Sequence, residues 1–156
     1  MRLPTLIAAA MLATATRAAP LVTNVPTLTV AGATRALADA QTSATASNNP
    51  SAIAVVDASG LLIAFVRMDG VRPGSVDLAI GKARAAAYMR RPTSELEDNV
   101  SKGRVGLATA GLTTLRGGAP IMVRGQCVGA VGIAGLSKEA DTTIANDVAA
   151  LIGAAS

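Results

Sequence analysis

Two apolar runs separated by a short polar segment stand out in the first half of the chain. They span residues 52–57 and 61–67, and residues 57–60 between them read Asp-Ala-Ser-Gly. Asp in the first position and Gly in the fourth favour a type I turn. In the second run both alternating sets of positions are apolar, so the hairpin must be covered on both faces. The pattern predicts an α+β fold with a central antiparallel sheet and helices on both faces.

Longer segments of small apolar residues predict helices around this sheet. The first helix should run from about residue 30 to residue 47, with Thr29 as N-cap and Ser-Asn-Asn-Pro as its end. The last should begin near Ser137, with Glu139 and Asp141 in its first turn, where acidic groups favour the helix dipole.

Two helices are expected in the middle of the chain. One runs from Ser75 to about Met89, with Ser75 as its cap. A short one restarts near Ser94, where Ser94 and Glu97 have the spacing of a capping box.

A second hairpin is predicted near the C-terminus. Residues 120–123 and 126–134 have strand character, and Arg124-Gly125 joins them. The segment before them, residues 101–120, is rich in glycine and small polar residues, as is typical of a mobile or ligand-binding loop.

The N-terminal segment has the order of features found in secretory leaders. A basic start at Arg2 is followed by a short apolar run and small residues around position 18. We therefore expect a signal peptide over 1–18, a tail over 19–27, a folded domain over 28–156, and a periplasmic or secreted protein. The apolar run is too short to cross a membrane. The alternative is an amphipathic or disordered tail on a cytosolic protein.

Composition excludes several classes of function. The chain has no histidine, which rules out a Ser-His-Asp triad, a His-ligated zinc and a proximal-histidine haem; we expect no metal site. Aromatic residues make up 1% of the chain, so no stacking platform for bases exists. Cys127 has no partner for a disulfide and is expected as an inert core residue.

Charge favours a small anionic ligand over a nucleic acid. Removing Arg2 and Arg17 from the 14 basic residues leaves 12 against 10 acidic ones, a net charge of +2. This is too low for binding a phosphate backbone. Basic residues nevertheless outnumber acidic ones between Arg67 and Arg124, where an anion would be attracted.

Candidate polar residues gather on the second predicted helix. On a helical wheel Asp77, Gly81, Arg84 and Tyr88 form one polar stripe. Lys82 lies on a semi-apolar flank, from which its ammonium either extends to water or projects into a pocket as a base or anion partner.

Two further candidates lie outside this helix. Arg67 and Asp69 close the second strand, either as an exposed ion pair in a turn or with Arg67 guiding an anion into a cleft. Gly117 and Gly118 precede a strand and offer backbone amides to a carboxylate or oxyanion.

Three blocks in this order resemble the GlcG/HbpS family, which also includes the C-terminal domain of PduO-type proteins. They are "AIAVVDASGLLIAFVRMDG", "SVDLAIGKARAAAYMRRPTSELE" and "GGAPIMVRGQCVGAVGIAG". The resemblance covers about residues 28–152 and implies a profilin-like three-layer sandwich. It also implies homo-oligomers, dimers or higher, and tetrapyrrole binding in some members.

The matching positions fall in all three blocks, with one departure in the helix. The family often has Lys-Ala-x-Thr-Ala, whereas this chain has Ala at position 85 in place of Thr. Without histidine, a haem iron would need a different axial ligand or would bind without a strong axial bond. The candidates are Tyr88, Met68, Met89, Met122, Cys127, Lys82 or a hydroxyl. The matching residues are Asp57, Gly60, Arg67, Asp69, Ser75, Ala79, Lys82, Ala83, Pro92, Gly117, Gly118, Pro120, Gly125, Gly129 and Gly132.

Three functions remain open from the sequence. The first is an exported binding protein whose lead ligand is haem or another anionic tetrapyrrole. The second is a cofactor-free isomerase, lyase or hydrolase acting on a small organic acid, with Lys82 as base and Arg67 as carboxylate clamp. The third is a structural or sensory partner module. The ligand-binding candidates are Arg67, Asp69, Lys82, Arg84, Tyr88, Gly117 and Gly118.

Overall fold

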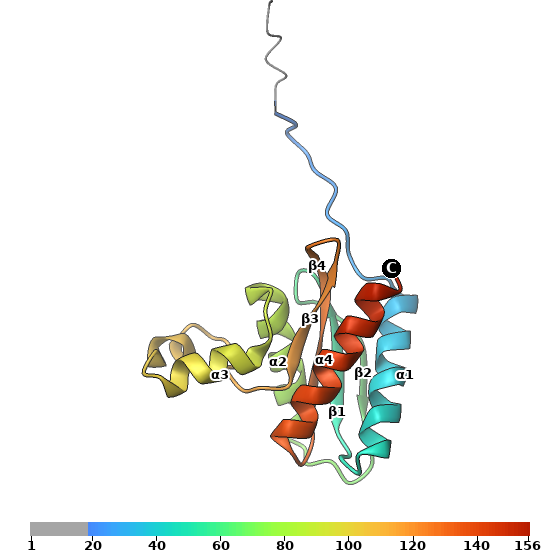
Figure 1. The fold of residues 1–156 in the computed structure, drawn as a ribbon, viewed down its shortest axis with the longest axis vertical. Coiled ribbons are helices and arrows are strands. Elements are labelled where there is room, and N and C mark those ends of the chain that lie inside the picture. Colours follow the sequence, from blue (N-terminus) through green and yellow to red (C-terminus); the bar gives the residue numbers. More distant parts are fainter. Residues whose placement is uncertain (1–18) are drawn as a thin grey trace, which may run out of the picture.

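The computed structural model describes residues 19–156; the expected signal peptide over 1–18 lies outside the described residues. Four antiparallel strands form one sheet in the order β2-β1-β4-β3. Helices α1 and α4 lie side by side on one face and α2 covers the other (Figure 1). The expected α+β sandwich is confirmed. Its elements are α1 (Val30–Ala46), β1 (Ala52–Asp57), β2 (Leu62–Arg67), α2 (Ser75–Met89), α3 (Thr93–Ser101), the 3-10 helix η1 (Val105–Thr109), β3 (Gly118–Val123), β4 (Gln126–Ala134) and α4 (Lys138–Ala154).

The two faces of the sheet carry different cores. Branched residues such as Ile53, Val131 and Ile133 face α1 and α4. The face toward α2 is made largely of alanine, from both the helix and the strands. A Cβ at Gly132 in β4 would overlap the backbone of α2 at Ala79 and Ala83. Because the residues between them are so small, α2 lies almost directly on the sheet.

The first hairpin forms through the expected turn. The Asp57 carboxylate accepts hydrogen bonds from the amides of Ser59 (2.8 Å) and Leu61 (2.9 Å), which confirms Asp57 as a turn residue. However, β2 is an edge strand, and most of its side chains are only half-buried. The expectation of full cover on both faces is therefore wrong for β2, because α2 lies over β4 and β1.

Helix starts agree with the sequence prediction at α1 and α4 and differ from it at α2 and α3. The Thr29 hydroxyl caps α1 as expected, and α4 starts near Ser137 as expected, with the Ser137 hydroxyl as its cap. Gly74, however, precedes α2, and Ser75 is its buried first residue. In α3 the expected capping box does not form, because the extended backbone of Pro92 starts the helix one residue earlier.

Helix α3 and η1 form an arm that projects from the body of the molecule (Figure 1). Arg116, in the returning chain, makes ion pairs with Glu97 and Asp98 of α3. Among the described helices, none has the length and apolar character that crossing a membrane requires.

Candidate functional site

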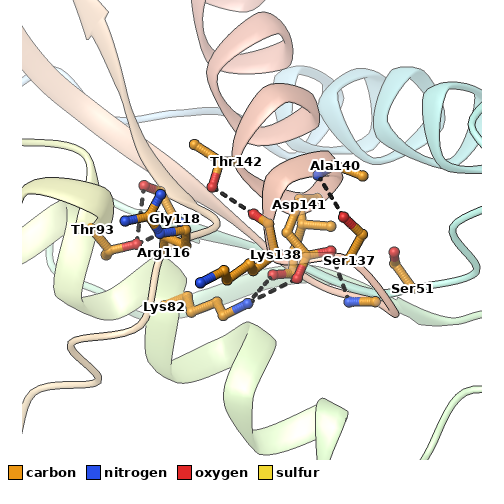
Figure 2. A network of polar contacts seen from close by, with 12 residues as sticks. Ser51, Lys82, Thr93, Arg116, Gly118, Ser137, Lys138, Ala140, Asp141 and Thr142 are labelled. Carbon is orange, nitrogen blue, oxygen red and sulfur yellow. Dashed lines mark hydrogen bonds and ion pairs between the residues drawn. The ribbon is translucent and has the colours of Figure 1, made fainter. Parts of the chain in front are cut away.

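Lys82 lies on the buried face of α2, pointing between β4 and the start of α4 (Figure 2). Its ammonium donates hydrogen bonds to the backbone oxygen of Ile133 (2.7 Å) and to Asp141 Oδ2 (3.0 Å). Lys82 is 5% exposed and Asp141 3%. The two opposite charges neutralise each other in a place that water does not reach, which is the condition under which a buried charge is tolerated.

The second oxygen of Asp141 extends this pair into a network. Asp141 Oδ1 accepts from the Asn49 side-chain amide (3.0 Å) and from the Gly135 backbone amide (2.9 Å). The Asn49 side-chain oxygen in turn accepts from the amides of Leu136 (2.8 Å) and Ser137 (3.0 Å). The network therefore ties the end of α1 and the core of α2 to the β4–α4 connection.

This geometry corrects the expectation for Lys82. The side chain neither extends to water nor projects into a pocket, because a carboxylate from a distant part of the chain holds its ammonium. Arg67 is exposed at the end of the edge strand β2, and no polar contact among residues 19–156 joins it to Lys82. The roles of both residues in catalysis stay untested predictions, and the structure does not bring the two together.

Gly117 and Gly118 are also held by hydrogen bonds within the protein. The Gly118 amide donates to the Thr93 hydroxyl (2.9 Å), and the Gly117 oxygen accepts from the Ile133 amide (2.8 Å). Both glycines are buried. The Gly118 amide is thus satisfied within the protein and does not face an incoming oxyanion, contrary to our expectation.

The outer side of α2 carries an open cleft. Its volume is ≈ 330 Å³, which is at the small end of the range for ligand pockets. We call it the α2 cleft. One wall is the polar stripe expected from the sequence, Asp77, Gly81, Arg84 and Tyr88, and the other is the loop of Gly111, Leu112 and Thr113.

Close approach of the loop to α2 requires glycine at position 81. A Cβ there would overlap the Thr113 hydroxyl oxygen. Ile80 and Leu112 add apolar surface to the cleft. The cleft thus combines one cation, one carboxylate, a phenol and some apolar surface.

Arg84 and Tyr88 lie at the end of the α2 cleft that borders the first hairpin. Arg84 Nε donates to the Gly60 oxygen (3.2 Å), and a Cβ at Gly60 would overlap the Tyr88 ring. No described residue accepts from the two Nη atoms of Arg84, so these can contact a ligand. Of the predicted ligand-binding residues, the cleft thus unites Arg84 and Tyr88, whereas Asp69 and Arg67 are exposed elsewhere.

Cys127 is buried in β4, as expected. Burial raises the pKa of its thiol, which keeps the sulfur protonated and weakly nucleophilic.

Sequence reasoning missed the partners that decide these environments. The sequence places Asp141 only in the first turn of the last helix, and Asn49 only at the end of the first. Asp141 pairs with Lys82 of α2 across 59 residues of sequence, and Asn49 pairs with Asp141 across 92. The approach of the loop had a signal in the sequence, namely Gly81 within the polar stripe, because a glycine on a helix lets another segment come close.

The family model of haem-degrading HbpS-like proteins matches residues 28–150. The chain belongs to the HbpS-like family. Protein GlcG of Escherichia coli K12 is 43% identical over 98 residues, which cover 62% of this chain and 73% of GlcG.

Two solved structures extend this relationship to the fold. The Klebsiella pneumoniae protein ORFY has a TM-score of 0.81 and 28% identity, covering 90% of this HbpS-like chain and 99% of its own. A PduOC–haem complex has a TM-score of 0.72 and 28% identity, covering 81% and 94% respectively. The sandwich described above is thus the fold of this family.

Proposed function

We propose that this protein binds haem, or another anionic tetrapyrrole, in the α2 cleft. The observation that carries the proposal is that Arg84 and Tyr88 line one cleft together with the apolar residues Ile80 and Leu112, in a chain whose family includes a haem complex. The structure describes every residue that lines the α2 cleft, so each of them can be tested by substitution.

The residues of the cleft fit the chemistry of haem. The free Nη atoms of Arg84 suit a propionate, because guanidinium and carboxylate form two parallel hydrogen bonds. Ile80 and Leu112 would contact the ring. Tyr88 would supply an oxygen to the iron, a type of axial ligand found in some haem proteins. Bound haem would provide redox-active iron at this surface.

We also propose that the chain forms a homo-oligomer. At ≈ 330 Å³ the α2 cleft is at the small end of ligand pockets, so part of a tetrapyrrole would project beyond it. A second copy would cover that part. Edge strand β2 supports self-association, since its apolar side chains are half-buried and its outer backbone edge is unpaired within the sheet.

Haem titration followed by the Soret band tests the proposed site. We expect saturable binding by the wild type, weaker binding by Arg84→Gln, and an altered Soret position in Tyr88→Phe. Arg124→Gln, which removes another exposed arginine, is the matched control. A flat titration at micromolar haem, or equal binding by Arg84→Gln and Arg124→Gln, would reject the site.

We further propose export to the periplasm or the medium, on the leader-like order of residues 1–18. Expression in a bacterial host followed by N-terminal sequencing of the periplasmic fraction tests this. A mature chain that begins at Ala19 is the expected result, and an uncleaved chain confined to the cytosol contradicts it.

The alternative, a cofactor-free enzyme on a small organic acid, depended on Lys82 as base. The buried pair with Asp141 leaves the Lys82 ammonium without access to a substrate. No observation in the structure favours this alternative over ligand binding.

A further inference from the structure

A second cleft lies at the edge strand β3, beyond the C-terminal end of α2. Its volume is ≈ 390 Å³, and it is enclosed by the start of α3, by β3 and by α4. We call it the β3 cleft. It shares no lining residue with the α2 cleft. Any ligand that it takes is therefore held by different groups from those proposed for haem.

Two adjacent arginines at the mouth make the β3 cleft cationic. Arg90 is exposed, and no described acceptor binds its side chain. Arg91 is only loosely paired with Glu95, at 3.5 Å between side chains that are both half exposed. One carboxylate faces two guanidinium groups, which leaves a net charge of +1 at the cleft.

The backbone at Arg90 fixes where its side chain leaves the helix. Arg90 ends α2 in the left-handed conformation, with φ 53°, a position that helices usually give to glycine. The chain therefore turns at Arg90, and Arg91 and Pro92 connect it to the start of α3.

Behind the arginines the floor of the cleft is apolar. It is formed by Ala119, Met122, Ala149 and Ala150, and Asn146 adds a side-chain amide at the rim. A single negative charge matches the net charge, and a short hydrocarbon matches the floor. We propose that the β3 cleft binds small aliphatic carboxylates, with the carboxylate on Arg90 and Arg91 and the alkyl chain on the alanine floor.

Titration of the ¹⁵N-labelled full chain with sodium hexanoate, followed by amide shifts, tests this proposal. We expect shifts at residues of the β3 cleft, and an affinity at least about tenfold lower in Arg90→Gln/Arg91→Gln, since charge-assisted hydrogen bonds are lost. Arg72→Gln/Arg124→Gln removes two other exposed arginines and should bind hexanoate as the wild type does. Thermal melts of both double variants check that they fold.

Three comparisons separate the proposed ligand from simpler anions and from haem. Ala150→Leu, at an exposed position of α4, fills the floor and should weaken hexanoate binding. Hexanol and inorganic phosphate should each bind more weakly than hexanoate. Equal binding of phosphate, or unchanged hexanoate binding in Arg90→Gln/Arg91→Gln, overturns the proposal. Loss of haem binding in that double variant, with Arg84→Gln unaffected, would assign the cleft to haem and also overturn it.

Discussion

Lys82 and Arg84 lie two residues apart on α2, yet their surroundings are opposite. Lys82 is buried, and its charge is neutralised by Asp141 from α4. Arg84 is exposed in the α2 cleft and uses only Nε for the protein. Two residues correspond to a rotation of about 200° on a helix. The comparison shows that the side of the helix on which a cation lies decides whether it is buried with a counter-charge or exposed in a cleft.

The largest effect should follow from breaking the buried pair. Asp141→Asn leaves the Lys82 ammonium buried without a counter-charge, and we expect the free energy of unfolding to fall by about 3–5 kcal/mol in urea denaturation. Asp39→Asn breaks the exposed pair with Arg35 and should cost no more than about 1 kcal/mol. Equal losses in the two variants would contradict a structural role for the Lys82 pair.

A smaller loss is expected from crowding the inner side of α2. In Gly132→Ala the new methyl group meets the backbone of α2, which cannot move aside without opening the core. We expect a loss of about 1–3 kcal/mol in the same measurement. Stability equal to that of the wild type would show that α2 does not lie directly on β4.

Gly81→Ala, the equivalent change on the outer side of α2, should weaken haem binding while leaving the free energy of unfolding nearly unchanged. In Gly81→Ala the methyl group meets the Thr113 hydroxyl, the end of a loop side chain that can rotate. Alanine also gains roughly 1 kcal/mol of helix propensity over glycine. We expect unchanged or slightly raised stability by urea denaturation and weaker haem binding by Soret titration. A loss as large as that of Gly132→Ala would remove the contrast between the two sides.

The smallest change in stability should come from Arg84→Gln. It removes one hydrogen bond to Gly60 at an exposed position, so we expect the free energy of unfolding to change by about 0.5 kcal/mol or less. Denaturation midpoints of this variant and of Arg124→Gln should agree closely. A loss above about 2 kcal/mol would show that Arg84 mainly stabilises the fold, as Lys82 does, and would contradict its availability to a ligand.

Local patterns were sufficient for most elements of the fold. The Thr29 cap and the Asp57 turn each depend on groups within four residues of each other, and both formed as expected. The start of α4 near Ser137 was also confirmed. The predicted β4 range of 126–134 was also confirmed. Prediction failed at Ser75 and Ser94, because their neighbours Gly74 and Pro92 occupy the capping positions.

Local sequence patterns were enough to predict the sandwich and the polar stripe of α2 that lines the α2 cleft, since turns, caps and helical periodicity are local properties. The burial and pairing of Lys82, and the exposure of Arg84 in the cleft, depend on how the layers pack. The pairing of Lys82 depends on Asp141, 59 residues away in sequence, and on β4 lying close enough to α2 to enclose the ammonium. Contacts of this range arise when the layers pack, and no local pattern records them.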